Sequence, residues 1–511
     1  MRNLLFFLIF SVSFFSFCQK KYDKILMKID SKKNFYSSIA QQIWSFAEMG
    51  YQEEKSSNLL KKILSDQEFN IKSGVANIPT AFMASYGSGL PIIAILGEYD
   101  ALPGLSQKRV PYKISAGGKA GHACGHHLFG TASVAAAIEI KNYLKENRKS
   151  GTIRYYGCPA EEGGSGKVYM TRDGLFNDVD IVLHWHAANQ NSASIRPALA
   201  NKSAKFRFYG VSAHAAGAPE KGKSALDGVE AMNTMVNMLR EHVTESTRIH
   251  YVITRGGEAP NVVPDFAEVY YYARHKTRDE VIKVFDRIVN AAKGAAIGTG
   301  TTMDYEMIGG THDMLHNKIL QKLVHKNLSY VGGYTYDNEE LIFAKEISKS
   351  MKTKLDLKYV EGVAPYEDYS PPGGSTDVGD VSYTVPTVGF RAATWVPETP
   401  AHSWQAVAAG GTSIGNKGMI VAAKTIVLTG VQLIENPKII KSIPGSDKLQ
   451  SALFNPPDDV LPETLPLMTL IFKPLCLRLF SKTKASTSES VIIISRLIMS
   501  LSNASVFGFA P

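Results

Sequence analysis

The stretch Ile92-Ile93-Ala94-Ile95-Leu96-Gly97-Glu98-Tyr99-Asp100 indicates the fold class, because a short apolar strand runs directly into two carboxylates. The same order recurs twice: residues 153–156 lead to Glu161 and Glu162, and residues 181–183 lead to His184 and His186. Helical patterns separate these strands between about residues 31 and 197. Such alternation predicts an α/β domain with a largely parallel sheet. Open α/β folds place their chemistry at the carboxyl ends of these strands.

The middle of the chain changes character. Residues 206–209, 249–253, 266–272 and 303–307 read as strands, and residues 225–243 and 279–292 read as amphipathic helices. The resulting order is βαββαβ, a compact two-layer unit. Alternation then resumes, with a strand at 387–390 and one long helix from about 405 to 434. We therefore expect the small unit to be inserted into the larger domain as a lid.

The chain divides into five predicted segments: a signal peptide (1–18), the first part of the catalytic domain (19–197), the inserted lid (198–313), the second part of the catalytic domain (314–440), and a C-terminal extension (441–511). The first segment has a charged start and an apolar core at residues 4–10, which is typical of a secretory signal. Cleavage before Gln19 and export are expected, with lipidation of Cys18 as the alternative. The extension is expected to be poorly ordered after about residue 467.

Charge and cysteine content exclude several classes of protein. The formal net charge is +9, but residues 468–511 alone carry five basic side chains against one acidic side chain. No basic stripe with interleaved aromatic residues occurs, so nucleic-acid binding is a poor interpretation. The extension has no apolar run of the roughly 20 residues that a membrane-spanning helix needs. Four cysteines are too few and too scattered for a disulfide framework.

Residues 121–127, Gly-His-Ala-Cys-Gly-His-His, place three histidines and one cysteine directly before an Ala-rich helix expected at 128–145. Cys124 and His126 would lie at the N-terminal end of this helix, where the helix dipole favours a thiolate ligand. Three interpretations remain open: half of a metal site, a buried inert cysteine, or a cysteine nucleophile paired with a histidine.

Glu161-Glu162 precedes a Gly-Gly turn, so the two carboxylates can point in different directions. One could bind a metal ion, and the other could take a proton from attacking water, which is the division of work in a metallohydrolase. A solvated surface turn is the alternative. His184 and His186 share a strand face, and spacing alone does not choose a ligand between them. His402, just before a helix, could be a ligand, a cap or a core residue.

Six motifs together resemble the metal-dependent amidohydrolases of the aminoacylase and carboxypeptidase superfamily. The resemblance covers roughly residues 28–459, and the motifs are residues 48–53 (Glu-Met-Gly-Tyr-Gln-Glu), 97–104 (Gly-Glu-Tyr-Asp-Ala-Leu-Pro-Gly), 121–127, 158–164 (Cys-Pro-Ala-Glu-Glu-Gly-Gly), 260–265 (Pro-Asn-Val-Val-Pro-Asp) and 400–405 (Pro-Ala-His-Ser-Trp-Gln). It implies a three-layer catalytic domain of the zinc-peptidase type with a ferredoxin-like lid. It also implies hydrolysis of the amide bond of N-acyl amino acids, with aminobenzoyl-glutamate as the leading substrate candidate.

The resemblance further implies the site residues. The implied metal ligands, for two divalent ions of zinc or manganese, are Cys124, His126, Glu162, His186 and His402. Glu161 would be the general base, and Asp100 would support the metal ligands. The lid would form a homodimer in which His214 reaches the partner's site and stabilises the oxyanion. Asn261 and Arg274 would hold the substrate, and a companion protein chain is a further expected partner.

Two departures from the family pattern concern His127 and Glu98, which stand where relatives carry an acidic or amide residue and a histidine ligand, respectively. Three rival functions remain open on the sequence alone: a dipeptidase or other acyl-amino-acid hydrolase of the same fold, a cysteine-nucleophile hydrolase, and a non-catalytic binding protein that keeps the metal site.

Overall fold

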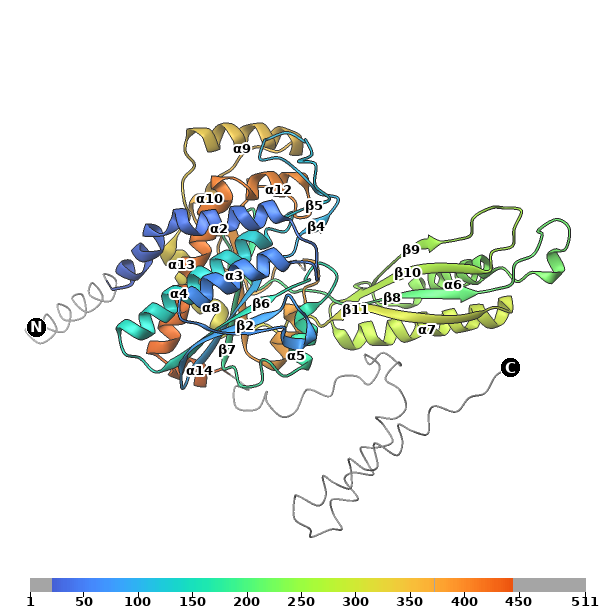
Figure 1. The fold of residues 1–511 in the computed structure, drawn as a ribbon, viewed down its shortest axis with the longest axis horizontal. Coiled ribbons are helices and arrows are strands. Elements are labelled where there is room, and N and C mark those ends of the chain that lie inside the picture. Colours follow the sequence, from blue (N-terminus) through green and yellow to red (C-terminus); the bar gives the residue numbers. More distant parts are fainter. Residues whose placement is uncertain (1–20, 372, 444–511) are drawn as a thin grey trace, which may run out of the picture. The chain divides into compact units, whose positions relative to one another are not determined.

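The computed structural model describes residues 21–371 and 373–443. The predicted signal peptide and most of the predicted C-terminal extension lie outside the described residues. A six-stranded sheet with the order β1-β2-β6-β3-β7-β12 forms the centre of the larger part (Figure 1). Its strands are β1 (Asn70–Ser73), β2 (Phe82–Ser88), β3 (Ile92–Glu98), β6 (Gly151–Cys158), β7 (Ile181–Ala188) and β12 (Thr387–Ala393). The short strands β4 (Leu102–Pro103) and β5 (Ala120–Gly121) pair separately.

The prediction of a largely parallel sheet is correct for four strands only. Strands β6, β3, β7 and β12 run parallel, whereas β1 and β2 extend the sheet with two antiparallel pairs. Strand β1 is short and mostly exposed, so it lacks the apolar run by which the other strands were found. The carboxyl ends of β6, β3 and β7 therefore lie side by side, as expected for a ligand site.

Both faces of this sheet are covered. The remaining helices of the larger part are α2 (Lys33–Phe46), α3 (Glu54–Asp66), α4 (His126–Glu146), α5 (Gly166–Arg172), α8 (Lys318–Val331), α9 (Asn338–Met351), α10 (Lys358–Glu361), α11 (Val378–Thr384), α12 (Trp404–Gly410), α13 (Ser413–Glu435) and α14 (Lys438–Lys441). Tyr155 of β6 points to α4, where its hydroxyl donates to the Gly130 carbonyl. Its neighbour Tyr156 points to the other face and donates to the Leu175 carbonyl after α5. The architecture is three-layered.

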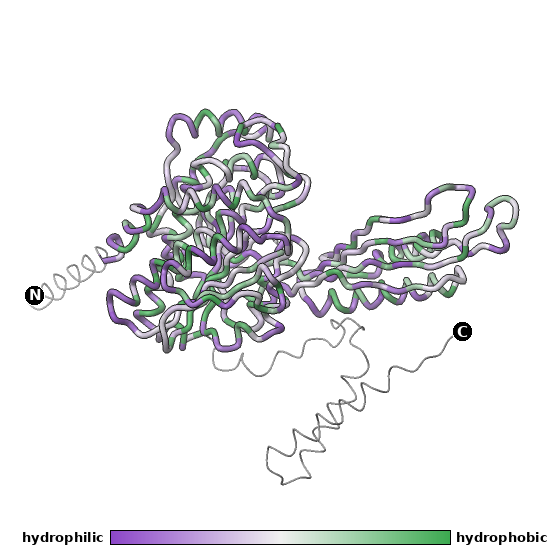
Figure 2. The backbone as a smooth tube through the Cα atoms, viewed as in Figure 1, coloured by the Kyte–Doolittle hydropathy of each residue, from purple (hydrophilic) through white to green (hydrophobic). Residues whose placement is uncertain are grey.

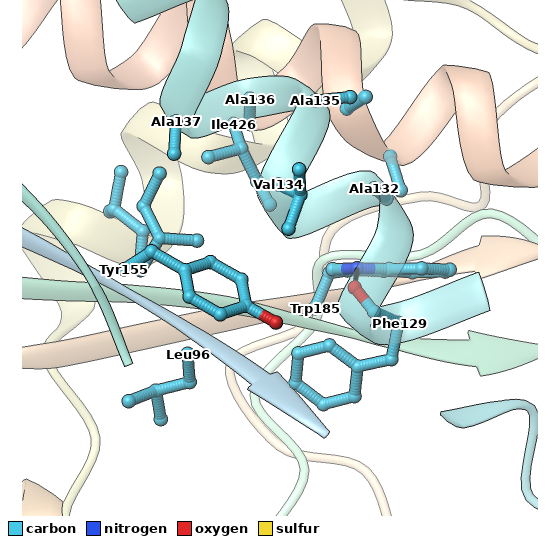
Figure 3. Packing of buried hydrophobic residues seen from close by; sticks show 14 of the residues in the cluster. Leu96, Phe129, Ala132, Val134, Ala135, Ala136, Ala137, Tyr155, Trp185 and Ile426 are labelled. Atoms are coloured by element: carbon cyan, nitrogen blue, oxygen red, sulfur yellow. Dashed lines mark hydrogen bonds between the residues drawn. The ribbon is translucent and has the colours of Figure 1, made fainter. Parts of the chain in front are cut away.

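Helix α4 is the centre of the packing. It contacts β3, β6 and β7 on one side and α13 on the other. Figure 3 shows its run of small residues, Ala132 to Ala137, between Ile426 of α13 and the large rings of Tyr155, Phe129 and Trp185. The Trp185 indole donates to the Phe129 carbonyl at 3.2 Å. Small side chains let two helices and a sheet approach closely, because little volume separates their backbones.

The inserted unit has its own sheet and core. Its sheet has the order β11-β8-β10-β9, and all neighbouring strands are antiparallel. The elements are β8 (Ala200–Tyr209), α6 (Ala225–Leu239), β9 (Arg248–Arg255), β10 (Phe266–His275), α7 (Arg278–Thr299) and β11 (Thr302–Thr311). Helices α6 and α7 cover one face of the sheet and enclose a hydrophobic cluster separate from that of the larger part. This is the predicted ferredoxin-like βαββαβ unit.

The single long helix predicted at 405–434 is two helices. Helix α12 ends at Gly410, and α13 starts after Thr412. The break follows from two consecutive glycines and from tight packing: a Cβ on Gly411 would lie 2.8 Å from Trp44 Cε2. By length and hydropathy α13 could cross a membrane, but 78% of its apolar window is buried inside the fold. In Figure 2 the peripheral helices alternate purple and green along their length, as expected for helices with one buried face.

Gly125 fixes the start of α4 against β7. It is the N-cap residue with φ +79°, and a Cβ placed on it would lie 2.4 Å from the Ala187 Cβ. We predict that Gly125→Ala lowers the free energy of unfolding by about 2–4 kcal/mol, because left-handed strain adds to a clash with a rigid neighbour. Gly332→Ala is the control, since Gly332 has φ +73° with nothing within 4 Å. Urea unfolding of both variants measures the difference, and equal losses would contradict this account.

Glu53 holds the turn after β6 in place. Its carboxylate is fully buried and accepts hydrogen bonds from the Ala160 backbone N–H at 2.8 Å and from the Thr80 hydroxyl at 3.0 Å. Burial, followed by the negative charge of Asp100, raises the pKa of Glu53 from 4.5 to about 7. The folded state therefore keeps a proton that the unfolded chain loses between these two pH values.

We predict that this proton makes the wild type lose stability, relative to Glu53→Gln, as the pH rises from about 4.5 to about 7. The shift corresponds to a relative loss on the order of 3 kcal/mol. Urea unfolding of the metal-free wild type and variant at several pH values gives this difference directly. A stability difference that stays constant across the window would show that Glu53 titrates normally.

Candidate active site

The site forms where the carboxyl ends of three strands meet the start of α4. Asp100 follows β3, Glu161 and Glu162 lie in the turn after β6, and His186 lies within β7. Cys124 and His126 come from the start of α4. His402 arrives from the second part of the larger domain, where its backbone N–H donates to the Ala123 carbonyl at 3.0 Å.

The structure brings all five predicted metal ligands together. Cys124 Sγ lies 3.4 Å from His186 Nε2, and His402 Nε2 lies 3.2 Å from Glu162 Oε1. Three groups have ligand atoms within 4.8 Å of one another: Cys124, His126 and His186; Cys124, Glu162 and His402; and Glu98, His126 and Glu161. Thiolate, imidazole and carboxylate are the donors that zinc and manganese accept. Because Cys124 belongs to two of the groups, adjacent metal positions can share it.

Several ligand-type atoms lack partners, as a metal site requires. Among the described residues, the buried atoms His126 Nε2, Glu98 Oε2 and Glu162 Oε1 make no hydrogen bond. Buried polar atoms are normally satisfied, and each exception calls for a missing partner. A divalent cation fits these residues, because it would satisfy imidazole and carboxylate atoms that converge without a proton to share.

Tertiary structure also separates His184 from His186. The His184 ring packs against the Cα of Gly389 on β12, where a Cβ would come within 2.2 Å of the imidazole. His184 belongs to none of the ligand groups, and its Nε2 is buried without a hydrogen bond. His186 faces Cys124 instead. Spacing left the choice open, and the packing of β7 against β12 decides it.

Asp100 braces the cluster from behind. One of its oxygens accepts from His126 Nδ1 at 2.8 Å, and the other accepts from the Glu162 backbone N–H at 2.8 Å. Burial alone would raise the pKa of Asp100, but His126 and the Glu162 N–H hold it below the usual range. A carboxylate on Nδ1 directs Nε2 of the same ring toward a metal ion.

The site carries an excess of buried negative charge. Burial, followed by the charges of Glu98 and Glu162, raises the pKa of Glu161 well above its ordinary value. Lys167, buried completely, pairs with Glu98 at 2.6 Å and with Asp377 at 2.7 Å. Bound cations lower such raised carboxyl pKa values. The sequence motifs did not single out Lys167 and Asp377, although a lysine directly after Gly164-Ser165-Gly166 was a usable signal.

The expectation of a thiolate at Cys124 is wrong for the metal-free protein. Cys124 precedes α4, but burial and the neighbouring Glu162 raise the pKa of its thiol above its ordinary value. Removal from water therefore outweighs the helix dipole at this position. Reactive cysteines have a lowered pKa and partial exposure, so the environment disfavours a cysteine nucleophile.

Backbone strain is concentrated at the site. Ala160, directly before Glu161, and His402 both have left-handed φ angles, +56° and +59°. Each costs roughly 1 kcal/mol relative to a helical or extended conformation. Non-glycine residues keep such angles where the surrounding structure imposes them, often at functional sites.

The lid residues lie at two different ends of the lid sheet. His214 and Asn261 sit together beyond the end of β8, where the Ala215 N–H donates to the Asn261 carbonyl. Arg274 lies at the opposite end, paired with Asn201 at the start of β8. Eight strand residues separate the two ends, roughly 27 Å. Within the described part of the chain, His214 forms no hydrogen bond or ion pair with the metal-type cluster.

His214 is prepared to donate a hydrogen bond. It is exposed, and its Nδ1 accepts from the backbone N–H groups of Ala216 at 3.2 Å and Gly217 at 3.1 Å. The neutral ring therefore carries its proton on Nε2. Arg274 has a buried Nε without a hydrogen-bond partner, and its guanidinium lies over the Tyr272 ring at 5.2 Å. A cavity of about 410 Å³ opens beside His402 and is lined by Trp404 and the 104–118 loop.

Comparisons with known proteins agree with this arrangement. Residues 200–298 match the peptidase dimerisation domain of the M20 family. The chain is 41% identical to one of the two p-aminobenzoyl-glutamate hydrolase subunits of Escherichia coli strain K12, over 79% of this chain and 90% of the relative. It is 27% identical to the Xaa-Arg dipeptidase of Mus musculus, over 81% of this chain and 89% of that protein.

Solved structures show the same fold. The chain is similar to an aminobenzoyl-glutamate utilization protein from Klebsiella pneumoniae, with a TM-score of 0.56 and 16% identity over 80% of this chain and 98% of that structure. It is also similar to a dinuclear metal-binding M20 peptidase from Bacillus subtilis, with a TM-score of 0.51 and 16% identity over 78% of this chain and 99% of that structure. The metal-type cluster, the inserted lid and the extended identity lead to one conclusion: the chain belongs to the M20 family of metal-dependent amidohydrolases and peptidases.

Proposed function

We propose that this chain hydrolyses the amide bond of N-acyl amino acids, with aminobenzoyl-glutamate or a similar aromatic acyl glutamate as substrate. The observation that carries the proposal is the convergence of five ligand-type side chains beside Glu161. The 41% identity to a p-aminobenzoyl-glutamate hydrolase supports this substrate class. Dipeptides are the second candidate, favoured by the similarity to the Xaa-Arg dipeptidase.

In the proposed mechanism, Cys124, His126, Glu162, His186 and His402 hold two divalent ions, zinc or manganese. Bound ions of this type polarise the substrate carbonyl and acidify the attacking water. Glu161, which is close to His126 but carries no backbone-fixing contact of the kind made by Asp100, accepts the water proton. It later delivers that proton to the leaving amine. Asp100 keeps His126 oriented throughout.

We expect Glu161→Gln to keep the fold and the metal content while turnover of aminobenzoyl-glutamate falls by on the order of 1000-fold, because the amide cannot accept a proton. Glu162→Gln and Cys124→Ala are matched comparisons that should lose metal as well. Product release is measured after chelation and after separate addition of zinc and manganese, and metal is measured by elemental analysis. Substantial turnover by Glu161→Gln would remove this residue from the role of base. A folded wild type inactive with every metal would favour a non-catalytic binding protein.

We further propose that the chain forms a homodimer through the lid, in which His214 acts at the partner's site. The separation of roughly 27 Å within the lid sheet supports this division, because Arg274 and His214 of one chain cannot both approach one substrate. The match of residues 200–298 to a dimerisation domain supports the same assembly. A companion protein chain is a further proposed partner, since the hydrolase of Escherichia coli has a second subunit besides the 41% identical relative.

Mixing two inactive variants tests the shared site. Random exchange of His214→Ala and Glu161→Gln chains makes half of the dimers mixed, and each mixed dimer contains one intact site of two. We therefore expect recovery of about one quarter of wild-type activity. Activity is measured after unfolding and refolding the variants together, with separately refolded variants as the control. No recovery, in a mixture proven to contain mixed dimers, would place His214 in its own chain's site or outside catalysis.

A further inference from the structure

Strand β12 places an arginine beside the metal-type cluster. Its parallel register with β7 pairs Arg391 with His186 and Gly389 with His184. Residues paired in this way project to the same face of a sheet. The Arg391 side chain therefore emerges next to His186, and it is half-buried. None of the sequence motifs includes this residue.

Arg391 has no protein partner among the described residues. Its guanidinium forms no ion pair and no hydrogen bond with any of them, although most other arginines near the core are paired, such as Arg154 with Asp178 at 2.6 Å. Arginine is rarely removed from water without a carboxylate or other acceptor. Five N–H donors are thus available at the wall of the site.

A second positive charge lies close to the first. Burial, followed by the charge of Arg196, lowers the pKa of Arg391 to about 10, while Cys124 acts in the opposite direction. The positive charge of Arg391 in turn contributes to the lowered pKa of His186, after burial and the charge of His126. Arg196 is exposed and likewise forms no ion pair with the described residues. Two unpaired guanidinium groups beside ligand-type residues form a site for an anion.

We propose that Arg391, with Arg196 at its rim, binds a carboxylate of the amino-acid part of the substrate. This inference rests on the proposed function, since the amino-acid part carries the negative charges of an aromatic acyl glutamate. The planar guanidinium presents paired donors that match a carboxylate. Arg391 belongs to the larger domain, so it holds the leaving group independently of lid position. Glutamate has an α- and a γ-carboxylate, and the experiment distinguishes them.

The test compares aminobenzoyl-glutamate with its α-amide and its γ-amide. The wild type should prefer the diacid over one of the two amides by on the order of 100-fold in kcat/KM. Arg391→Met should lose that preference, with a similar loss on the diacid and little change on the amide. Arg391→Lys should keep part of the preference, because it retains the charge without the paired donors. The amide whose discrimination disappears identifies the carboxylate bound.

A rival role for Arg391 is to balance the charge of Cys124. In that case Arg391→Met would lower the metal content, or would slow all three substrates equally, and either result overturns the proposal. Arg196→Met provides a second variant at an exposed position that does not endanger folding, and it should weaken the same preference several-fold. An unchanged preference in both variants also overturns the proposal.

Binding of L-glutamate separates this inference from the proposed function. Calorimetry on the metal-loaded wild type should detect glutamate binding that Arg391→Met loses and that glutamine or isoglutamine reproduces only weakly. If no acyl-amino acid is hydrolysed but this Arg391-dependent binding persists, the proposed function fails and the carboxylate site stands. If hydrolysis proceeds while glutamate binds equally to both proteins, or binds to neither, the carboxylate site fails alone.

Discussion

The carboxylate of Asp100 connects the three segments on which the site depends. It follows β3, accepts from His126 at the start of α4, and accepts from the Glu162 backbone N–H after β6. Both hydrogen bonds are 2.8 Å long and their Asp100 acceptor is buried, where water does not compete and their directionality is retained. The positions of one predicted ligand and of the whole Glu161-Glu162 turn therefore depend on a single side chain. Glu53 secures the other side of that turn through Ala160.

Charge is the second constraint on this centre. Glu98, Asp100, Glu161, Glu162 and Asp377 converge in the protein interior, and Lys167 compensates only two of them directly. Burying carboxylates is costly unless cations or hydrogen bonds accompany them, which explains why the pKa of Glu161 rises in the metal-free protein. Divalent ions would remove this cost and would lower the pKa of the Cys124 thiol at the same time. The fold thus stores an electrostatic demand that metal binding meets.

The work of substrate recognition is distributed over distant parts of the chain. The lid carries Arg274 at one end and the His214–Asn261 pair at the other, whereas Arg391 comes from a strand of the central sheet. A rigid sheet positions Arg391 beside the reacting groups, and a separately packed lid brings in the remaining contacts. This division matches the general behaviour of enzymes in which a moving element completes a preformed site.

The sequence alone determined the fold class, the inserted βαββαβ unit and the ligand-type residues, because strand periodicity and local motifs depend on neighbouring residues. It also grouped the strand ends correctly, since parallel strands direct their carboxyl ends to one edge. Only the tertiary structure chose His186 over His184, through the packing of Gly389, and divided the predicted 405–434 helix at Gly411 against Trp44. It alone related Arg391 to His186 and Lys167 to Glu98, because these contacts join residues 69 to 205 positions apart. Burial likewise reversed the expected ionisation of Cys124, and burial is a property of the folded chain.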